Sequence, residues 1–170
     1  KEFHRTADVR TDLELVMAGF PGMEGTALLA REKEEELKKR FPLELVENAM
    51  EFDRDLCRQE AVRIGWECGA AAMHDVSQGG VFGALWEFLE SNGTGMEADL
   101  RKIPIRQETV EICEFFGVNP YQMLSTGSLL IAAADGEGLV QKMALEGIPS
   151  AMIGRTTSGK DRILRNGEEV

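Results

Sequence analysis

Short strand-like segments alternate with longer helix-like segments along the whole chain. Five short segments are rich in apolar or small residues and end at turn residues, a pattern typical of strands, and they cover 13–17, 70–73, 95–100, 129–134 and 151–154. Five longer segments repeat apolar residues at helical spacing, and they cover 26–40, 43–67, 81–92, 107–116 and 135–146. The second of these helices is expected to break near Arg58. The last strand-like segment, 162–164, precedes Asn166-Gly167 and predicts a hairpin.

This order of elements predicts the fold class. Strands that alternate with helices indicate an α/β (α+β) domain in which helices are layered on a β-sheet. The expected terminal hairpin favours an antiparallel edge, so we expect a mixed sheet. Residues 17–170 are expected to form one domain, because a chain of this length can bury roughly 70% of its unfolded surface. Residues 1–16 are expected to be a linker or the remnant of a preceding N-terminal domain.

The acidic composition limits the kinds of partner. The formal net charge of −11 argues against a nucleic acid, because nucleic-acid-binding surfaces are basic. A nucleotide substrate stays possible, because nucleotide sites use backbone N–H groups and a metal ion. No apolar run approaches the roughly 20 residues of a membrane helix, and no basic-then-apolar leader opens the sequence, so a cytoplasmic location is expected. Cys57, Cys68 and Cys113 form no C-x-x-C pair, which indicates reduced thiols.

The strongest local signal for chemistry is segment 74–80, which reads HDVSQGG. Gly79 and Gly80 stand before a predicted helix, whose first N–H groups favour an anion such as a phosphate. Asp75 and Ser77 add a carboxylate and a hydroxyl. Two interpretations stay open: a ligand site, or a tight strand–helix turn in which a side chain caps the helix. His74 is more often a hydrogen-bonded structural residue than a catalytic base.

Two further segments could bind a ligand or simply form turns. Glu24 and Gly25 lie in the sequence GMEGT at a helix entrance, where Thr26 is the alternative cap. Ser125 lies in the sequence STGS directly before the strand at 129. Phosphate-cradling, dinucleotide-binding, nucleophile-elbow and paired-cysteine signatures are absent from the sequence, and the histidine spacing predicts no metal site.

Three blocks in order resemble a known family. They are HDVSQGGVFGALWEF, then IPIRQETVEICEFFGVNP, and then STGSLLIAA with AMIGR. Together they are similar to the C-terminal domain of the aminoimidazole ribonucleotide synthetase (PurM-like) superfamily, and nearest to its hydrogenase maturation (HypE-like) branch. In that branch a proline follows the aspartate, and an acid stands at the position of Thr126. Val76, Thr126 and the absence of a terminal cysteine depart from that pattern.

The resemblance implies an ATP-dependent enzyme of two domains that dimerises through its N-terminal domains. It places ATP and magnesium on the N-terminal domain, so no metal ligand is assigned here and the chain is expected to be inactive alone. The C-terminal domain would form the acceptor or phosphate side of the cleft for a small-molecule or nucleotide substrate. Carried over by position, the cleft residues are His74, Asp75, Ser77, Gly79 and Gly80, with Glu24, Gly25 and Ser125 as further candidates. The alternative is a non-catalytic dimerisation or partner-binding module.

Overall fold

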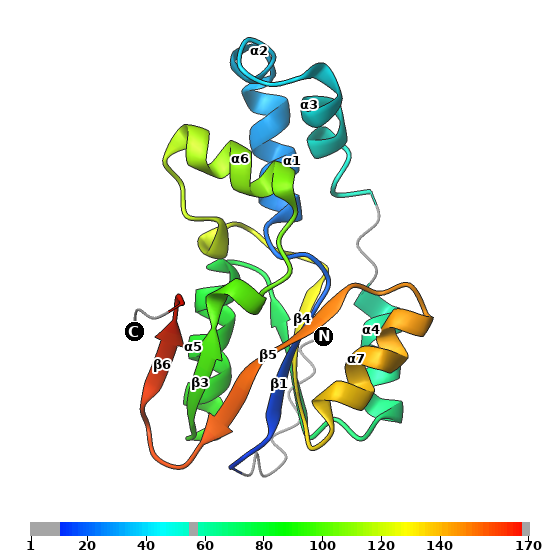
Figure 1. The fold of residues 1–170 in the computed structure, drawn as a ribbon, viewed down its shortest axis with the longest axis vertical. Coiled ribbons are helices and arrows are strands. Elements are labelled where there is room, and N and C mark those ends of the chain that lie inside the picture. The colour runs from blue at the N-terminus through cyan, green and yellow to red at the C-terminus, as the bar shows by residue number, and fades with distance from the viewer. Residues whose placement is uncertain (1–10, 55–57, 168–170) are drawn as a thin grey trace.

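A computed structural model describes residues 11–54 and 58–167, and its centre is one mixed β-sheet (Figure 1). The strands run in the order β2-β4-β1-β5-β3-β6. The pairs that join β2 to β3 through β4, β1 and β5 are antiparallel, whereas β6 is parallel to β3. The predicted fold class is therefore confirmed. The strands are β1 (Glu14–Ala18), β2 (Ala72–Val76), β3 (Gly95–Asp99), β4 (Ser128–Ala133), β5 (Ser150–Thr157) and β6 (Arg162–Arg165).

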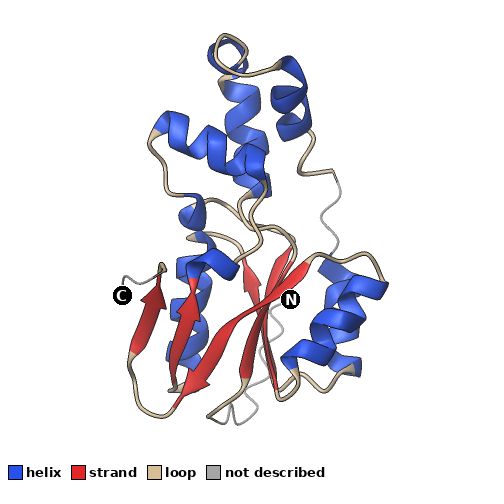
Figure 2. Cartoon of the chain, viewed as in Figure 1, coloured by secondary structure: helices blue, strands red, loops and turns tan. Residues whose placement is uncertain are grey.

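The helices occupy both faces of the sheet and one end of it (Figure 2). The six described helices of eight or more residues overlap predicted helical segments, because their apolar residues recur at helical spacing. The helices are α1 (Met23–Glu32), α2 (Glu34–Leu37), α3 (Leu43–Met50), α4 (Arg58–Glu67), α5 (Gly80–Asn92), α6 (Gln107–Phe116) and α7 (Gly136–Leu145), with short 3₁₀ turns η1 (Leu100–Lys102) and η2 (Pro120–Gln122). None of the described helices is long and apolar enough to cross a membrane.

Each face of the sheet has its own apolar core. On one face, α5 buries Leu85 and Phe88 against strand residues such as Leu15 and Leu130. On the other face, the core contains Ile64 of α4 and Leu139 of α7, and these helices lie over β4, β1 and β5. Alternation along a strand sends neighbouring residues to opposite faces, so β1 and β4 contribute to both cores. The charged part of the second face, over β3 and β6, is described below.

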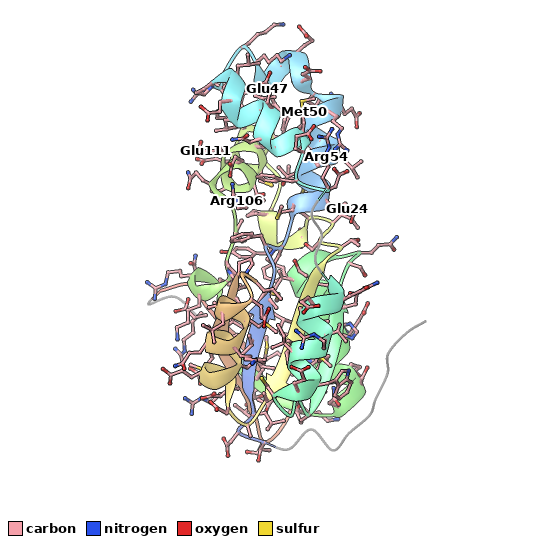
Figure 3. The ribbon with its side chains drawn as sticks, turned by 90° about the vertical axis from the view of Figure 1, so that its right-hand side faces the viewer. Glu24, Glu47, Met50, Arg54, Arg106 and Glu111 are labelled. Atoms are coloured by element: carbon pink, nitrogen blue, oxygen red, sulfur yellow. The ribbon has the colours of Figure 1, made fainter. Side chains whose placement is uncertain are left out.

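A helical lobe stands on one end of the sheet and is formed by α1, α2, α3 and α6 (Figure 1). It has its own small core, which includes Leu37, Val46 and Ile112. At the base of the lobe, Arg106 makes cation–π contacts with two rings: its guanidinium lies 5.5 Å from the ring centre of Phe20 and 5.3 Å from that of Phe52. Figure 3 shows Arg106 and Glu24 at the level where the lobe meets the sheet.

Three sequence expectations need correction. The predicted terminal hairpin is wrong, because β6 pairs in parallel with β3 and not with β5. The predicted helix 26–40 is two helices, α1 and α2, separated at Lys33. The predicted strand 70–73 lies further along as Ala72–Val76. The break expected near Arg58 is confirmed, because α4 begins there. Strand β1 begins at Glu14, so the expected domain boundary at residue 17 falls inside the sheet.

Candidate functional site

Three connecting segments meet at the end of the sheet that lies under the lobe. Strands β1 and β2 are both antiparallel to β4. The carboxyl ends of β1 and β2 therefore lie at the same end of the sheet as the amino end of β4. The segments that leave or enter there are 19–25, 77–80 and 121–127. Six of the eight sequence-predicted site residues fall in these three segments: Ser77, Gly79, Gly80, Glu24, Gly25 and Ser125.

Hydrogen bonds between main-chain groups and short side chains hold these segments together. The N–H of Ser125 donates to the carbonyl of Ser77 at 3.3 Å, and the N–H of Gly25 donates to the carbonyl of Leu124 at 2.9 Å. The Ser125 hydroxyl accepts from the N–H of Gly22 at 2.8 Å and donates to the carbonyl of Met123 at 2.6 Å. Ser125 is buried. Its hydroxyl therefore links the segments 19–25 and 121–127 at this end of the sheet.

Gly80 is required by the packing of the chain against itself. Its φ of +61° lies in the left-handed region, which side chains disfavour. A Cβ atom on Gly80 would lie 2.5 Å from the carbonyl oxygen of Tyr121 and 2.7 Å from that of Met123. Gly25 is also close to this loop, because its Cβ would lie 3.0 Å from the backbone nitrogen of Leu124. At both positions the glycine makes room for main chain, and for Gly80 this contact agrees with the tight-turn interpretation of the two that the sequence left open.

The beginning of α5 is partly available to an anion, since the N–H of Gly80 already donates to the carbonyl of Ser77 at 3.2 Å. Gly79, which precedes the helix, is exposed. No side chain caps α5, and its first turn contains no acidic residue. The first N–H groups of a helix have no partner within the helix and carry its positive dipole end. A phosphate or carboxylate at this position would satisfy them.

His74 and Asp75 do not converge on this helix start. His74 lies on the α5 face, where its Nε2 is 3.0 Å from Oε2 of Glu87 and its ring packs edge-on against Phe88. Asp75 follows in the same strand, so alternation sends it to the opposite face, the one on which Met73 packs. The two adjacent residues therefore act on different sides of the sheet.

Glu24 lies in the first turn of α1, and its Oε2 accepts a hydrogen bond from the N–H of Thr126 at 3.3 Å.

Sequence reasoning missed two aromatic residues beside the start of α5. The rings of Phe82 and Tyr121 stack with centroids 5.6 Å apart, and the Tyr121 hydroxyl donates to the carbonyl of Leu100 at 3.2 Å. Tyr121 is the only tyrosine in the sequence, which was the one available signal.

The described residues differ in how well they suit a phosphate and a magnesium ion. The start of α5 suits a phosphate group, as argued above. Within residues 11–54 and 58–167, no three histidine, cysteine, aspartate or glutamate side chains gather so that they could hold a metal ion. Magnesium prefers carboxylate and phosphate oxygens, so its protein ligands would have to come from elsewhere.

Comparison with known proteins gives the family. Residues 11–165 match the family described as AIR synthase related protein, C-terminal domain. A carbamoyl dehydratase HypE from Rhodobacter capsulatus is 28% identical over 94 residues, which are 53% of this chain and 28% of that protein. A phosphoribosylformylglycinamidine synthase subunit PurL from Caldanaerobacter subterraneus is 27% identical over 158 residues, which are 89% of this chain and 20% of that protein.

The fold is shared with a solved structure. The crystal structure of HypE from E. coli superposes with a TM-score of 0.76 at 20% identity, covering 98% of this chain and 50% of that one. The chain thus spans about half of this structural relative and smaller parts of the two sequence relatives. Residues 11–165, which match the family, include all six strands and every helix described above. The chain belongs to the family of AIR synthase related proteins, as their C-terminal domain.

Proposed function

We propose that this chain is the C-terminal domain of an ATP-dependent enzyme and that it forms the phosphate or acceptor side of the active-site cleft. The start of α5, with Ser77 and Gly79, would bind an anionic group of the substrate. ATP and magnesium would be held by an N-terminal domain that this chain does not contain. The intact protein would be a homodimer, and this domain alone would not turn over substrate.

The observation that carries the proposal is the uncapped start of α5. Ser77 and Gly79 precede a helix of 13 residues whose first turn has no acid. Segments 19–25, 77–80 and 121–127 meet at this end of the sheet, and the hydrogen bonds between them fix the orientation of the helix start. A rigid, positively polarised helix end is suited to a phosphate, because its N–H groups need no rearrangement on binding. Family membership and the enzymatic names of the relatives support the same proposal.

The proposed roles divide between the ATP-binding domain and this chain. Bound ATP with magnesium would supply a phosphoryl group that activates an oxygen of the acceptor. The residues of this chain would orient the acceptor phosphate at the start of α5. The stacked rings of Phe82 and Tyr121 would cover one side of that position from water.

The test is magnesium-dependent ATP hydrolysis by the full-length gene product with Gln78→Glu. Gln78 is exposed and directly precedes Gly79. A carboxylate there interacts favourably with the helix dipole, so stability should be retained, but it repels a phosphate. We expect kcat/KM to fall roughly tenfold, equivalent to about 1.4 kcal/mol, without loss of thermal stability.

Gln141→Glu is the matched control, because Gln141 is exposed on α7 and the charge change is the same. It should leave turnover unchanged. Equal turnover in all three proteins would refute the placement of the substrate at α5. If the full-length protein neither binds nor hydrolyses ATP, the proposal fails and the chain is a non-catalytic partner-binding module.

A further inference from the structure

A charged depression lies on the second face of the sheet, over the strands that α4 and α7 leave open. Its volume is about 220 Å³, and its lining comes from β1, β3, β5, β6 and η1. Strand register explains how the charges gather: Arg155 lies between Glu14 and Glu97 across the sheet, and Asp99 lies beside Arg165. These side chains share the face opposite α5, because Met96 and Ala98, the alternating neighbours, are buried under α5.

The acidic groups of the depression already have partners. Oε2 of Glu14 accepts from the N–H of Gly136 at 2.6 Å. Oε1 of Glu97 accepts from Nε of Arg165 at 2.6 Å. Asp99 accepts from the N–H of Arg101 at 2.9 Å and forms an ion pair with its guanidinium at 3.3 Å. Glu97 and Asp99 are therefore paired with cations, whereas Glu14 keeps its charge and is held by a main-chain N–H.

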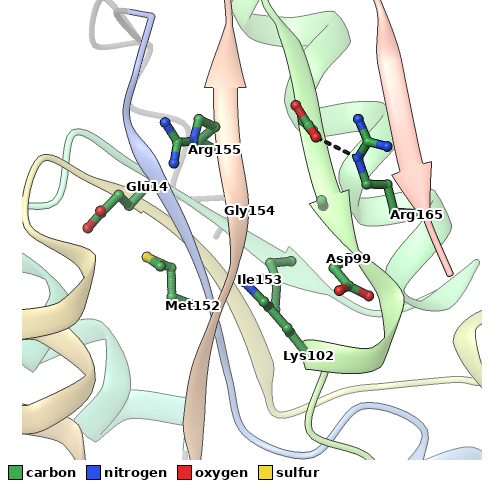
Figure 4. Close-up of a pocket in the computed structure, with 10 residues that line it drawn as sticks. Glu14, Asp99, Lys102, Met152, Ile153, Gly154, Arg155 and Arg165 are labelled. Atoms are coloured by element: carbon green, nitrogen blue, oxygen red, sulfur yellow. Dashed lines mark hydrogen bonds and ion pairs between the residues drawn. The ribbon is translucent and has the colours of Figure 1, made fainter. Parts of the chain in front are cut away.

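Two cations of the depression take no part in its ion pairs. Within the described residues, neither Lys102 nor Arg155 makes an ion pair or a side-chain hydrogen bond. Figure 4 shows the Lys102 side chain reaching across β5 toward Ile153, and Arg155 further along the same strand. Met152 supplies an apolar contact on this face of β5, whereas the side chain of Ile153 is buried in the core under α5. An arginine offers a planar fork to an oxyanion and a lysine offers a point charge.

We propose that Lys102 and Arg155 bind a small oxyanion of the phosphate class in this depression. The size agrees, because about 220 Å³ is below the roughly 300–1,000 Å³ of sites for drug-sized ligands. A chain with a net charge of −11 repels anions in general, so a local excess of positive charge is required for an anion to be retained. Around the depression there are four cations, Arg101, Lys102, Arg155 and Arg165, against the three acids Glu14, Glu97 and Asp99. This inference concerns the face opposite α5, and it stands independently of the function proposed above.

The test is a titration of the 170-residue chain with inorganic phosphate, followed by amide NMR shifts at constant ionic strength. We expect saturable shifts at residues 97–102 and 152–155, with a midpoint in the millimolar range. The double variant Lys102→Gln/Arg155→Gln should weaken binding at least tenfold. Both side chains are exposed, so the fold should be retained. The matched control is Lys142→Gln/Lys160→Gln, which removes two exposed cations elsewhere.

The outcomes separate a site from general ion attraction. Saturation by phosphate, its loss in the double variant and its retention in the control would support the proposal. Equal shifts with chloride, or phosphate shifts that persist in the double variant, would overturn it. Acetate serves as the carboxylate arm, and saturation by acetate as tight as that by phosphate would overturn the assignment to the phosphate class. Shifts confined to 79–83 would belong to α5 and would refute this second site.

Discussion

Gly80 offers a sharp test of the packing at the candidate site. Replacing it with alanine adds one methyl group at a φ of +61°, where its carbon would lie 2.5 Å and 2.7 Å from two main-chain carbonyl oxygens. The left-handed conformation alone costs about 1–2 kcal/mol for a non-glycine residue. Displacing the 121–124 backbone adds about 1–3 kcal/mol of overpacking. Loss of a hydrogen bond such as Ser125 N–H to Ser77 adds about 1 kcal/mol.

Gly93→Ala is the matched control. Gly93 has almost the same backbone angle, φ +66°, but nothing lies within 4 Å of the position of its Cβ. It should therefore show only the backbone cost of about 1–2 kcal/mol, whereas Gly80→Ala should cost about 3–6 kcal/mol. For a chain of this size, an excess of about 2 kcal/mol lowers the melting temperature by roughly 4–8 °C.

Thermal and urea unfolding followed by circular dichroism would measure both variants. If the two alanine variants unfold at the same temperature, the loop 121–124 does not restrain Gly80 and the packing argument is wrong. If Gly80→Ala keeps its stability but loses binding of an anion at α5, the glycine serves a ligand, which is the other interpretation that the sequence left open.

Three further predictions concern other parts of the molecule. Thr109→Val should cost about 1 kcal/mol in urea unfolding, because it removes the hydrogen bond between the buried hydroxyls of Thr109 and Thr26, which lie 3.0 Å apart, while the Thr26 hydroxyl keeps its bond to the carbonyl of Gly22. No change would show that this pair does not join α1 to α6. The Arg31 guanidinium holds the pKa of Asp53 below its ordinary value through a side-chain hydrogen bond, so this contribution to stability is present above about pH 3.9 and is lost as the pH falls through the lower folded pKa. Carboxyl NMR titration should show the Asp53 midpoint moving upward in Arg31→Gln, and an unmoved midpoint would contradict the assignment. Burial raises the pKa of the Cys113 thiol to about 11, so peptide mapping after iodoacetamide at pH 8 should find Cys113 unmodified in the folded chain and modified in urea, whereas modification in the folded chain would show that the site opens.

Local signals predicted most elements but not the partners of each strand. The helices that lie near predicted segments have apolar residues at helical spacing, and this pattern depends on neighbours a few residues apart. The parallel pairing of β6 with β3 depends on contacts between residues 96–99 and 162–165, and Asn166-Gly167 carries no information about them. The turn signal was read as a hairpin because the rule for such dipeptides is local.

The site was predicted in part for the same reason. The strand was expected to end at 73, and this placed His74 and Asp75 in a turn with a common direction. Because β2 continues to Val76, alternation separates them. The constraint on Gly80 comes from residues 121–123, about 40 positions away, so the dipeptide Gly79-Gly80 could not reveal which glycine faces the chain and which faces solvent.

The position of β1 determines when this protein can be assembled. β1 begins at Glu14, yet its two neighbours in the sheet are β4 and β5, whose residues 128–133 and 150–157 are near the other end of the chain. Contacts so distant in sequence slow folding. On the ribosome, β1 cannot pair with β4 until about residue 133 has emerged, or with β5 until about residue 157 has emerged. The lobe helices α1 and α3 have each other to pack against much earlier. During synthesis, the edges of β1 would therefore be the surface most exposed to aggregation and the natural target for a chaperone.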